Sequence, residues 1–283
     1  MGPSSQASYP IGILDSGLGG LSILRALQQA IPQESFVYFG DSKNAPYGAR
    51  SEEEILRLIQ QAADMLLQRQ IKLLVLGSST ITTVALTDLR SRFTLPIIGT
   101  DPAVGLAIDA TRSKVVGVLS TRATAHGKLL DDLVASLATP KAIHILRAWH
   151  NDLVPMLERG ETDTPALRAI LREALSPLAA AGADQLVLAS THFTFLKSTI
   201  QAEFGDTFGF VDSAGTVTAE VAATLRREGL SVSAGEGGST TYLFTGDLEL
   251  ARAGVVALLN SLPSAEATLA EKLLVQSPFT STL

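Results

Sequence analysis

The amino-acid sequence predicts an α/β protein with two pseudo-symmetric lobes, each built on a mostly parallel sheet flanked by helices. Strand-like and helix-like segments alternate, and the alternation restarts near residue 115. Two apolar runs, 73–76 and 186–188, stop abruptly at small hydroxyl residues, which is typical of strands buried on both faces of a parallel sheet. The length of 283 residues also favours two domains over one.

The first alternation covers residues 11–98. Ser51 and Glu54 form a capping box, in which the serine side chain accepts a hydrogen bond from the amide three residues on, so a helix begins there. The whole pattern predicts strands at 11–14, 36–39, 71–76 and 96–98, and helices at 21–31, 51–68 and 78–92.

The second alternation begins at residue 115. A glycine- and serine-rich stretch at 231–239 predicts a loop, and 241–244 predicts an edge strand before a last helix that ends near Leu262. The segments before this loop predict strands at 115–119, 142–146, 186–188 and 208–211, and helices ending at 137, 159, 181 and 227.

Composition limits the kinds of ligand and location. The net charge of −6 argues against an extended nucleic-acid surface, although it does not exclude a small anion bound by backbone amides. The chain has no cysteine and only four histidines without HExxH-type spacing, so we expect no disulfide and no metal site. No signal peptide or membrane span is apparent, which predicts a cytoplasmic protein.

The two hydroxyl-tipped strand ends match each other. Aligning the apolar runs places Ser78 on Ser190, and open α/β sheets hold their ligands at the carboxyl ends of strands. A single such end would favour a simpler role, in which the hydroxyls cap the following helices. Two copies, the second followed by His192, favour two related lobes that face a shared site.

Two loops at strand ends offer ligand-binding groups. The turn at 15–20 lacks the third glycine of a dinucleotide loop, and Asp15 would repel a pyrophosphate, so we expect its amides and Ser16 to hold a small carboxylate. Asp15 would point into the site or cap the next helix. In the second loop, Tyr47 and the amides around Gly48 would either bind the ligand or serve only to form the turn.

These motifs together carry a resemblance to a known family. The chain resembles the glutamate racemases, which belong to the cofactor-independent aspartate/glutamate racemases, from about Ile11 to Leu262. The resemblance implies inversion of the α-carbon of glutamate for peptidoglycan, with no pyridoxal phosphate, other cofactor or metal. It rests on the segments Asp15–Gly20, Gly40–Gly48, Thr80, Thr191–His192 and Thr245–Asp247.

The resemblance also implies a domain organisation. The first lobe would contain residues 10–98 and 209–262, the second lobe residues 99–208, and the active site would lie between them. Residues 1–9 are predicted to form a disordered leader, and 263–283 a tail in which we find no chemistry. A homodimer is compatible with the sequence.

In this family two cysteines act as acid and base on opposite faces of the α-carbon. The matching positions are Ser78 and Ser190, so this chain departs from the family pattern at both. An aspartate, a histidine and a glutamate that assist the thiols match Asp15, His192 and Glu158. The family positions that bind the substrate carboxylates and ammonium match Ser16, Tyr47, Gly48, Ser79, Thr80, Thr121, Thr124 and Thr191.

The serine replacements leave three hypotheses open. A neutral hydroxyl is a much weaker base than a thiolate, so glutamate racemisation would be weakened or lost while binding of glutamate or a related small dicarboxylic or amino acid is retained. A non-racemising ligand-binding or regulatory homologue is the second hypothesis. The third is a decarboxylase or hydrolase that uses Ser190 and His192.

Overall fold

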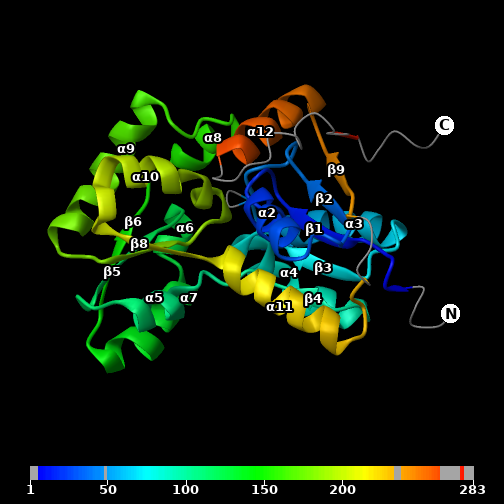
Figure 1. Ribbon diagram of the computed structural model, residues 1–283, viewed down its shortest axis with the longest axis horizontal. Helices are drawn as coiled ribbons and strands as arrows, with labels where there is room; N and C mark the ends of the chain where they lie inside the picture. The colour runs from blue at the N-terminus through cyan, green and yellow to red at the C-terminus, as the bar shows by residue number, and fades with distance from the viewer. Residues whose placement is uncertain (1–5, 48–49, 233–236, 262–274, 277–283) are drawn as a thin grey trace.

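The computed structural model describes residues 6–47, 50–232, 237–261 and 275–276. Two lobes lie side by side, one around each of two sheets, and every paired strand runs parallel to its neighbour (Figure 1). The predicted α/β class with two mostly parallel, helix-flanked sheets is therefore confirmed.

The first sheet has six strands in the order β10-β9-β2-β1-β3-β4. Its inner strands are apolar and buried on both faces, as expected for a parallel sheet covered by helices. Its strands are β1 (Ile11–Asp15), β2 (Phe36–Gly40), β3 (Leu73–Leu76), β4 (Ile97–Ile98), β9 (Thr240–Phe244) and β10 (Val275–Gln276).

Two layers of helices cover this sheet. Alternate side chains of each strand point to opposite faces, so Tyr38 packs with one layer and Phe39 with the other. The predicted Ser51 cap is confirmed, because Ser51 Oγ accepts a hydrogen bond from the Glu54 amide at 3.3 Å. One layer is α3 (Glu52–Gln68) and α4 (Ser79–Arg92); the other is α2 (Leu21–Ala30), α11 (Ser213–Arg227) and α12 (Leu248–Ser261).

The second sheet has four strands in the order β6-β5-β7-β8. This repeats the order β2-β1-β3-β4 of the first sheet, so β7 takes the place of β3 and the sheets share one topology. Its strands are β5 (Val115–Leu119), β6 (His144–Ala148), β7 (Gln185–Leu188) and β8 (Gly209–Asp212); its helices include α5 (Val104–Ala110), α8 (Leu153–Glu158), α9 (Pro165–Ala180) and α10 (Lys197–Phe204).

The helix predicted to run through Leu137 is interrupted. It forms α6 (Arg122–Ala125), then α7 (Lys128–Leu133), then a π-helical turn at Val134–Ala138. Gly127 separates the two helices in an extended conformation, with φ −84° and ψ 145°. A glycine costs little in such a conformation and weakens a continuous helix.

Three sequence-based boundaries differ from the structure. The predicted lobe boundary at 209 cuts off β8, which pairs with β7 in the second sheet, so the chain returns to the first lobe after Asp212. The predicted edge strand is interior, because β10 from the tail pairs with β9. Within the predicted leader, Lys72 Nζ donates to the Ala7 carbonyl at 2.6 Å, so its described part is tied to the first lobe.

The lobes share part of their apolar core. Buried side chains of α2, α11 and α12 form one cluster with those of α8, α9 and the 3₁₀ segment η4 (Thr191–Leu196). η4 contacts α2, and α8 contacts α12. The segment that follows β7 is therefore packed against the first lobe rather than exposed at the end of the second.

Candidate active site

Ser78 and Ser190 occupy matching positions with matching backbones. Ser78 follows β3 with φ −146° and ψ 137°, and Ser190 follows β7 with φ −136° and ψ 137°. Both are half-buried, and neither side chain makes a capping hydrogen bond to its helix. The capping role weighed from the sequence is therefore not what these hydroxyls do.

Three more hydroxyls resemble this pair. Ser16, Ser79 and Thr80 are also half-buried. None of the five side chains makes a hydrogen bond to a residue that the structure describes. Because they follow β1, β3 and β7, they offer polar groups at the carboxyl ends of these strands, where a ligand of an α/β protein is expected.

Asp15 organises the turn that follows β1. Its Oδ2 accepts hydrogen bonds from the amides of Gly17 and Gly20, both at 3.1 Å, and lies 3.3 Å from the hydroxyl of Tyr38. Its Oδ1 is buried and has no partner among the described residues. Burial raises the pKa of Asp15, and the charge of His192 and the two amides offset this only in part.

Glu158 and His192 form an ion pair at the junction of the lobes. Glu158 Oε1 lies 2.6 Å from His192 Nε2 and accepts a hydrogen bond from the Leu18 amide of the first lobe at 3.0 Å. Burial alone would lower the pKa of His192, but the bond to Glu158 and the nearby carboxylates raise it. Burial raises the pKa of Glu158 less than His192 and the Leu18 amide lower it.

The turn at 15–20 lies between the two strand ends. A Cβ atom added to Gly77, next to Ser78, would lie 3.2 Å from Gly20 Cα. A Cβ atom added to Gly19 would lie 2.4 Å from His192 Nδ1. One side of the turn thus touches the end of β3 and the other touches η4, which only glycines permit at this distance.

In the loop after β2, the tyrosine hydroxyl binds a protein group instead of pointing to a ligand as expected. Tyr47 is buried, and its hydroxyl donates to Asp41 Oδ2 at 2.6 Å, so it is already engaged. The Asp41 carboxylate also accepts hydrogen bonds from Asn44 Nδ2 and from Thr245 Oγ1, the latter at 2.6 Å. The Tyr47 carbonyl is also engaged, because it accepts a hydrogen bond from the Arg50 amide at 2.9 Å, and Gly48 lies outside the described residues.

The remaining predicted threonines divide into two groups. Thr121 caps α6, with its Oγ1 3.3 Å from the Thr124 amide and 3.1 Å from Thr124 Oγ1, so these hydroxyls are partly engaged at the end of β5. Thr191 is buried beside His192, and a Cβ atom on Gly19 would lie 2.6 Å from its Oγ1. Thr191 therefore belongs to the junction of the lobes.

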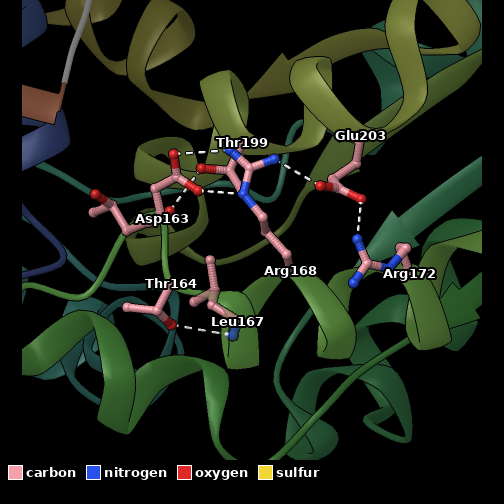
Figure 2. A network of polar contacts seen from close by, with 8 residues as sticks. Asp163, Thr164, Leu167, Arg168, Arg172, Thr199 and Glu203 are labelled. Atoms are coloured by element: carbon pink, nitrogen blue, oxygen red, sulfur yellow. Dashed lines mark hydrogen bonds and ion pairs between the residues drawn. The ribbon is translucent and has the colours of Figure 1, made fainter.

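A polar network joins α9 and α10 to the loop that follows α8 (Figure 2). Thr199 Oγ1 in α10 donates to the Thr162 carbonyl at 2.6 Å, which joins the helix after His192 to the loop after Glu158. Arg168 in α9 binds Asp163 of this loop and, at 2.6 Å, Glu203 of α10.

Two residues that sequence reasoning missed belong to this site. Tyr38 reaches Asp15 from β2, yet its place in an apolar run marked it only as a core residue. Asp41 was visible in the Gly40-Asp41 motif, but nothing local to that motif indicated that Thr245, more than two hundred residues away, would bind it.

Other features of the described chain do not coincide with this site. A groove of about 930 Å³ between α4, α7 and α11 contains none of the predicted site residues. Among the described residues, no group of three or more His, Asp or Glu side chains is arranged to hold a metal ion. None of the helices in this part of the chain combines the length and apolar character needed to cross a bilayer.

The chain is similar in sequence to known glutamate racemases. The chain is 46% identical to the glutamate racemase of Deinococcus radiodurans over 245 residues, which covers 87% of this chain and 84% of the relative. It is 36% identical to the glutamate racemase of Ralstonia pickettii over 263 residues, covering 93% and 92%.

Solved structures show the same architecture. The glutamate racemase isoform RacE1 of Bacillus anthracis matches with a TM-score of 0.79 and 27% identity, covering 95% of this chain and 97% of that one. Escherichia coli glutamate racemase, solved with L-glutamate and an activator, matches with a TM-score of 0.76 and 26% identity, covering 89% and 94%. The family model described as Asp/Glu/Hydantoin racemase matches residues 11–222, and the chain therefore belongs to this family.

Proposed function

We propose that this protein binds glutamate, or a closely related small dicarboxylic amino acid, between its two lobes. The observation that carries this proposal is the set of five half-buried hydroxyls at the carboxyl ends of β1, β3 and β7, which have no hydrogen-bond partner among the described residues. They flank Asp15 on one side and the Glu158–His192 pair on the other. The similarity to an Escherichia coli enzyme solved with L-glutamate supports the choice of ligand.

The charges around the site suit a dicarboxylate. Burial raises the pKa of Asp15, which shifts its equilibrium towards the neutral form, and this form would repel a bound carboxylate less than the ionised form. The raised pKa of His192 favours the imidazolium, whose charge Glu158 balances. The amides of Gly17, Leu18 and Gly20 already donate to Asp15 and Glu158. The hydrogen bonds to a ligand would therefore come from the half-buried hydroxyls that have no partner among the described residues.

The proposed reaction is a 1,1-proton transfer at the α-carbon. A base on one face removes the α-proton, and an acid on the opposite face delivers a proton to the same carbon, which inverts it without loss or gain of atoms. Ser78 with Asp15 would serve one face, and Ser190 with His192 and Glu158 the other. Because a neutral hydroxyl is a weak base, we propose that this inversion is slow or absent, while binding is retained.

A ligand-binding protein that does not racemise is the second candidate function. It is favoured by the same fact that weakens the first, the absence of any thiol in the chain. A Ser–His nucleophile gains no support, because His192 Nε2 is bound to Glu158 and the Ser190 hydroxyl makes no hydrogen bond to His192.

The test measures exchange and binding separately. L- and D-glutamate are incubated with the protein in heavy water, and loss of the α-proton signal is followed by NMR while calorimetry measures affinity. Exchange with inversion supports slow racemisation, and binding without exchange supports the second function. If the protein shows no exchange and binds no small dicarboxylic acid, the proposal is refuted. Ser78→Ala/Ser190→Ala is the matched control for background exchange.

The cellular role follows from the reaction if it occurs. D-Glutamate is the product that peptidoglycan synthesis requires, and we propose a place in that synthesis, in the cytoplasm. Light scattering of the protein with and without glutamate would show whether it forms the homodimer that the sequence allows.

A further inference from the structure

The two oxygens of Asp15 have different surroundings. We propose that Asp15 accepts and donates its proton through Oδ1 alone, and that Tyr38 is the positioning residue that keeps Oδ2 turned towards the protein. This inference rests on the proposed function, because it concerns the carboxyl group that would assist Ser78.

Oδ2 is fully occupied. The amides of Gly17 and Gly20 both donate to it at 3.1 Å, and the Tyr38 hydroxyl lies at 3.3 Å. A carboxylate oxygen has two lone pairs, so two amide donors and a shared hydroxyl leave no room for a proton. Oδ1 is equally buried but has no partner among the described residues. The proton of the neutral acid therefore belongs on Oδ1.

Tyr38 is built into the core as a fixed donor. Its ring is fully buried and packs 5.7 Å from the ring of Phe244 and 6.3 Å from that of Tyr242. Its hydroxyl lies 2.8 Å from the Gly17 carbonyl and 3.3 Å from Asp15 Oδ2, so one hydrogen is shared between Asp15 and Gly17 at the start of the turn. Rotation of the Asp15 carboxyl would break its bonds to both amides and to Tyr38 at once.

Four titratable groups face Asp15. His192 and Glu158 approach from the second lobe, Tyr38 from β2 and Tyr47 from the loop after β2. Burial and the neighbouring carboxylates hold the pKa of Tyr38 far above its usual range, so Tyr38 stays a donor at every pH at which the protein is studied. Any change of charge in this group of four is thus left to Asp15, Glu158 and His192.

The test compares two tyrosines of the same core. Tyr38→Phe and Tyr242→Phe each remove one buried hydroxyl from the first sheet, but only the first removes a donor to Asp15. The pKa of Asp15 is read from a carbon-13 NMR titration of aspartate-labelled protein without ligand. We expect it to rise by about one unit in Tyr38→Phe, because the carboxylate loses a hydrogen bond, and to stay unchanged in Tyr242→Phe.

A second variant guards against loss of folding. Site-specific replacement of Tyr38 by 3-fluorotyrosine keeps the ring and hydroxyl but makes the hydroxyl a stronger donor, so the pKa of Asp15 should fall. Equal titrations in all variants would overturn the role of Tyr38. Because the titration needs no ligand, it remains informative if calorimetry finds no glutamate binding, a result that would count against the proposed function instead.

Discussion

The ends of β3 and β7 share a backbone and differ in what surrounds it. Ser78 and Ser190 have nearly the same dihedral angles and the same half-burial at equivalent strands of the two sheets. Beside Ser78 lies a buried carboxyl group held by backbone amides, with no cation bonded to it. Beside Ser190 lies a bonded pair of opposite charges, Glu158 and His192.

This difference separates scaffold from chemistry. The repeated strand order explains why each lobe presents one side chain at the matching strand end. It would place a cysteine, a serine or an alanine there equally well. The groups beside the two serines do not follow the repeat: one lobe supplies the buried carboxyl group of Asp15, and the other an ion pair that also reaches across to Leu18. Protein pseudo-symmetry places the two groups, and local electrostatics decides what each can do.

The largest effect should come from giving both strand ends a thiol. Ser78→Cys/Ser190→Cys adds little volume at half-buried positions and supplies two groups that can ionise near neutral pH. We expect glutamate racemisation to rise by about 10³-fold or more, measured by circular dichroism of the reaction mixture.

The single variants make the comparison sharper. Each should accelerate α-proton exchange in heavy water for one enantiomer more than for the other, because each restores a base on one face only. Equal acceleration of both enantiomers by one thiol would contradict the assignment of the two serines to opposite faces.

The second effect concerns the ion pair, which has no counterpart beside Ser78. Glu158→Gln leaves His192 buried without its partner, and we expect about 3 kcal/mol of lost stability in urea unfolding at pH 5.5. Glu161→Gln, in the exposed pair with Arg159 three residues on, is the control and should cost far less.

The pH dependence of the stability lost in Glu158→Gln follows from the shifted pKa values of His192 and Glu158. The raised pKa of His192 means that its contribution is fully present below its unfolded value near 6.5 and is lost as pH rises through the folded value. The lowered pKa of Glu158 means that its contribution is present above 4.5 and is lost as pH falls through the folded value. The difference between wild type and Glu158→Gln should therefore shrink at pH 9; a constant difference would argue against the ion pair.

The third effect tests the turn between the strand ends. The Cβ of Gly19→Ala would lie 2.4 Å from His192 Nδ1, so the buried imidazole must move. We expect about 2 kcal/mol of lost stability and about a tenfold loss of glutamate affinity by calorimetry. Gly215→Ala is the control, because nothing lies within 4 Å of the added atom in that exposed helical turn. An unchanged affinity in Gly19→Ala would place His192 away from the ligand.

Much of the fold could be predicted because its signals are local. Apolar runs bounded by turn residues located most of the described strands, and the Ser51–Glu54 spacing located a helix start. The position of β9 depends on which strand pairs beyond it, and its partner β10 lies more than thirty residues later in a tail whose sequence shows some helical pattern. The four residues of β8 would have the same pattern in either sheet, so the boundary at 209 could not be corrected from sequence.

The site shows the same limit at the level of single atoms. The motifs indicated Asp15 and Tyr47 as site residues but could not predict which partners the Asp15 oxygens and the Tyr47 hydroxyl would bind. Tyr47 turns inward because Asp41 is fixed by Thr245, which follows the distant strand β9, and Asp15 leaves one oxygen without a described partner because Tyr38 and two amides bind the other. Such choices depend on packing between elements, which periodicity does not encode.

The smallest effect concerns two polar networks that lie outside the serine-bearing strand ends, one in each lobe. In the first lobe the network is buried: Thr245 Oγ1 donates to Asp41 and accepts from the Lys43 amide, and both Thr245 and Asp41 are 3% exposed. Thr245→Val keeps the shape but removes both bonds, and we expect about 1 kcal/mol of lost stability, measured by urea unfolding.

In the second lobe the outer part of the network is exposed. Arg172 binds Glu203 with its side chain 54% accessible, so its pairing competes with water, and Arg172→Ala should move the melting temperature by about 1 °C or less (Figure 2). A larger loss from Arg172→Ala than from Thr245→Val would reverse this order. It would mean that the exposed Arg172–Glu203 pair contributes more to stability than the buried Thr245–Asp41 contact, so that burial does not decide which polar network stabilises its lobe more.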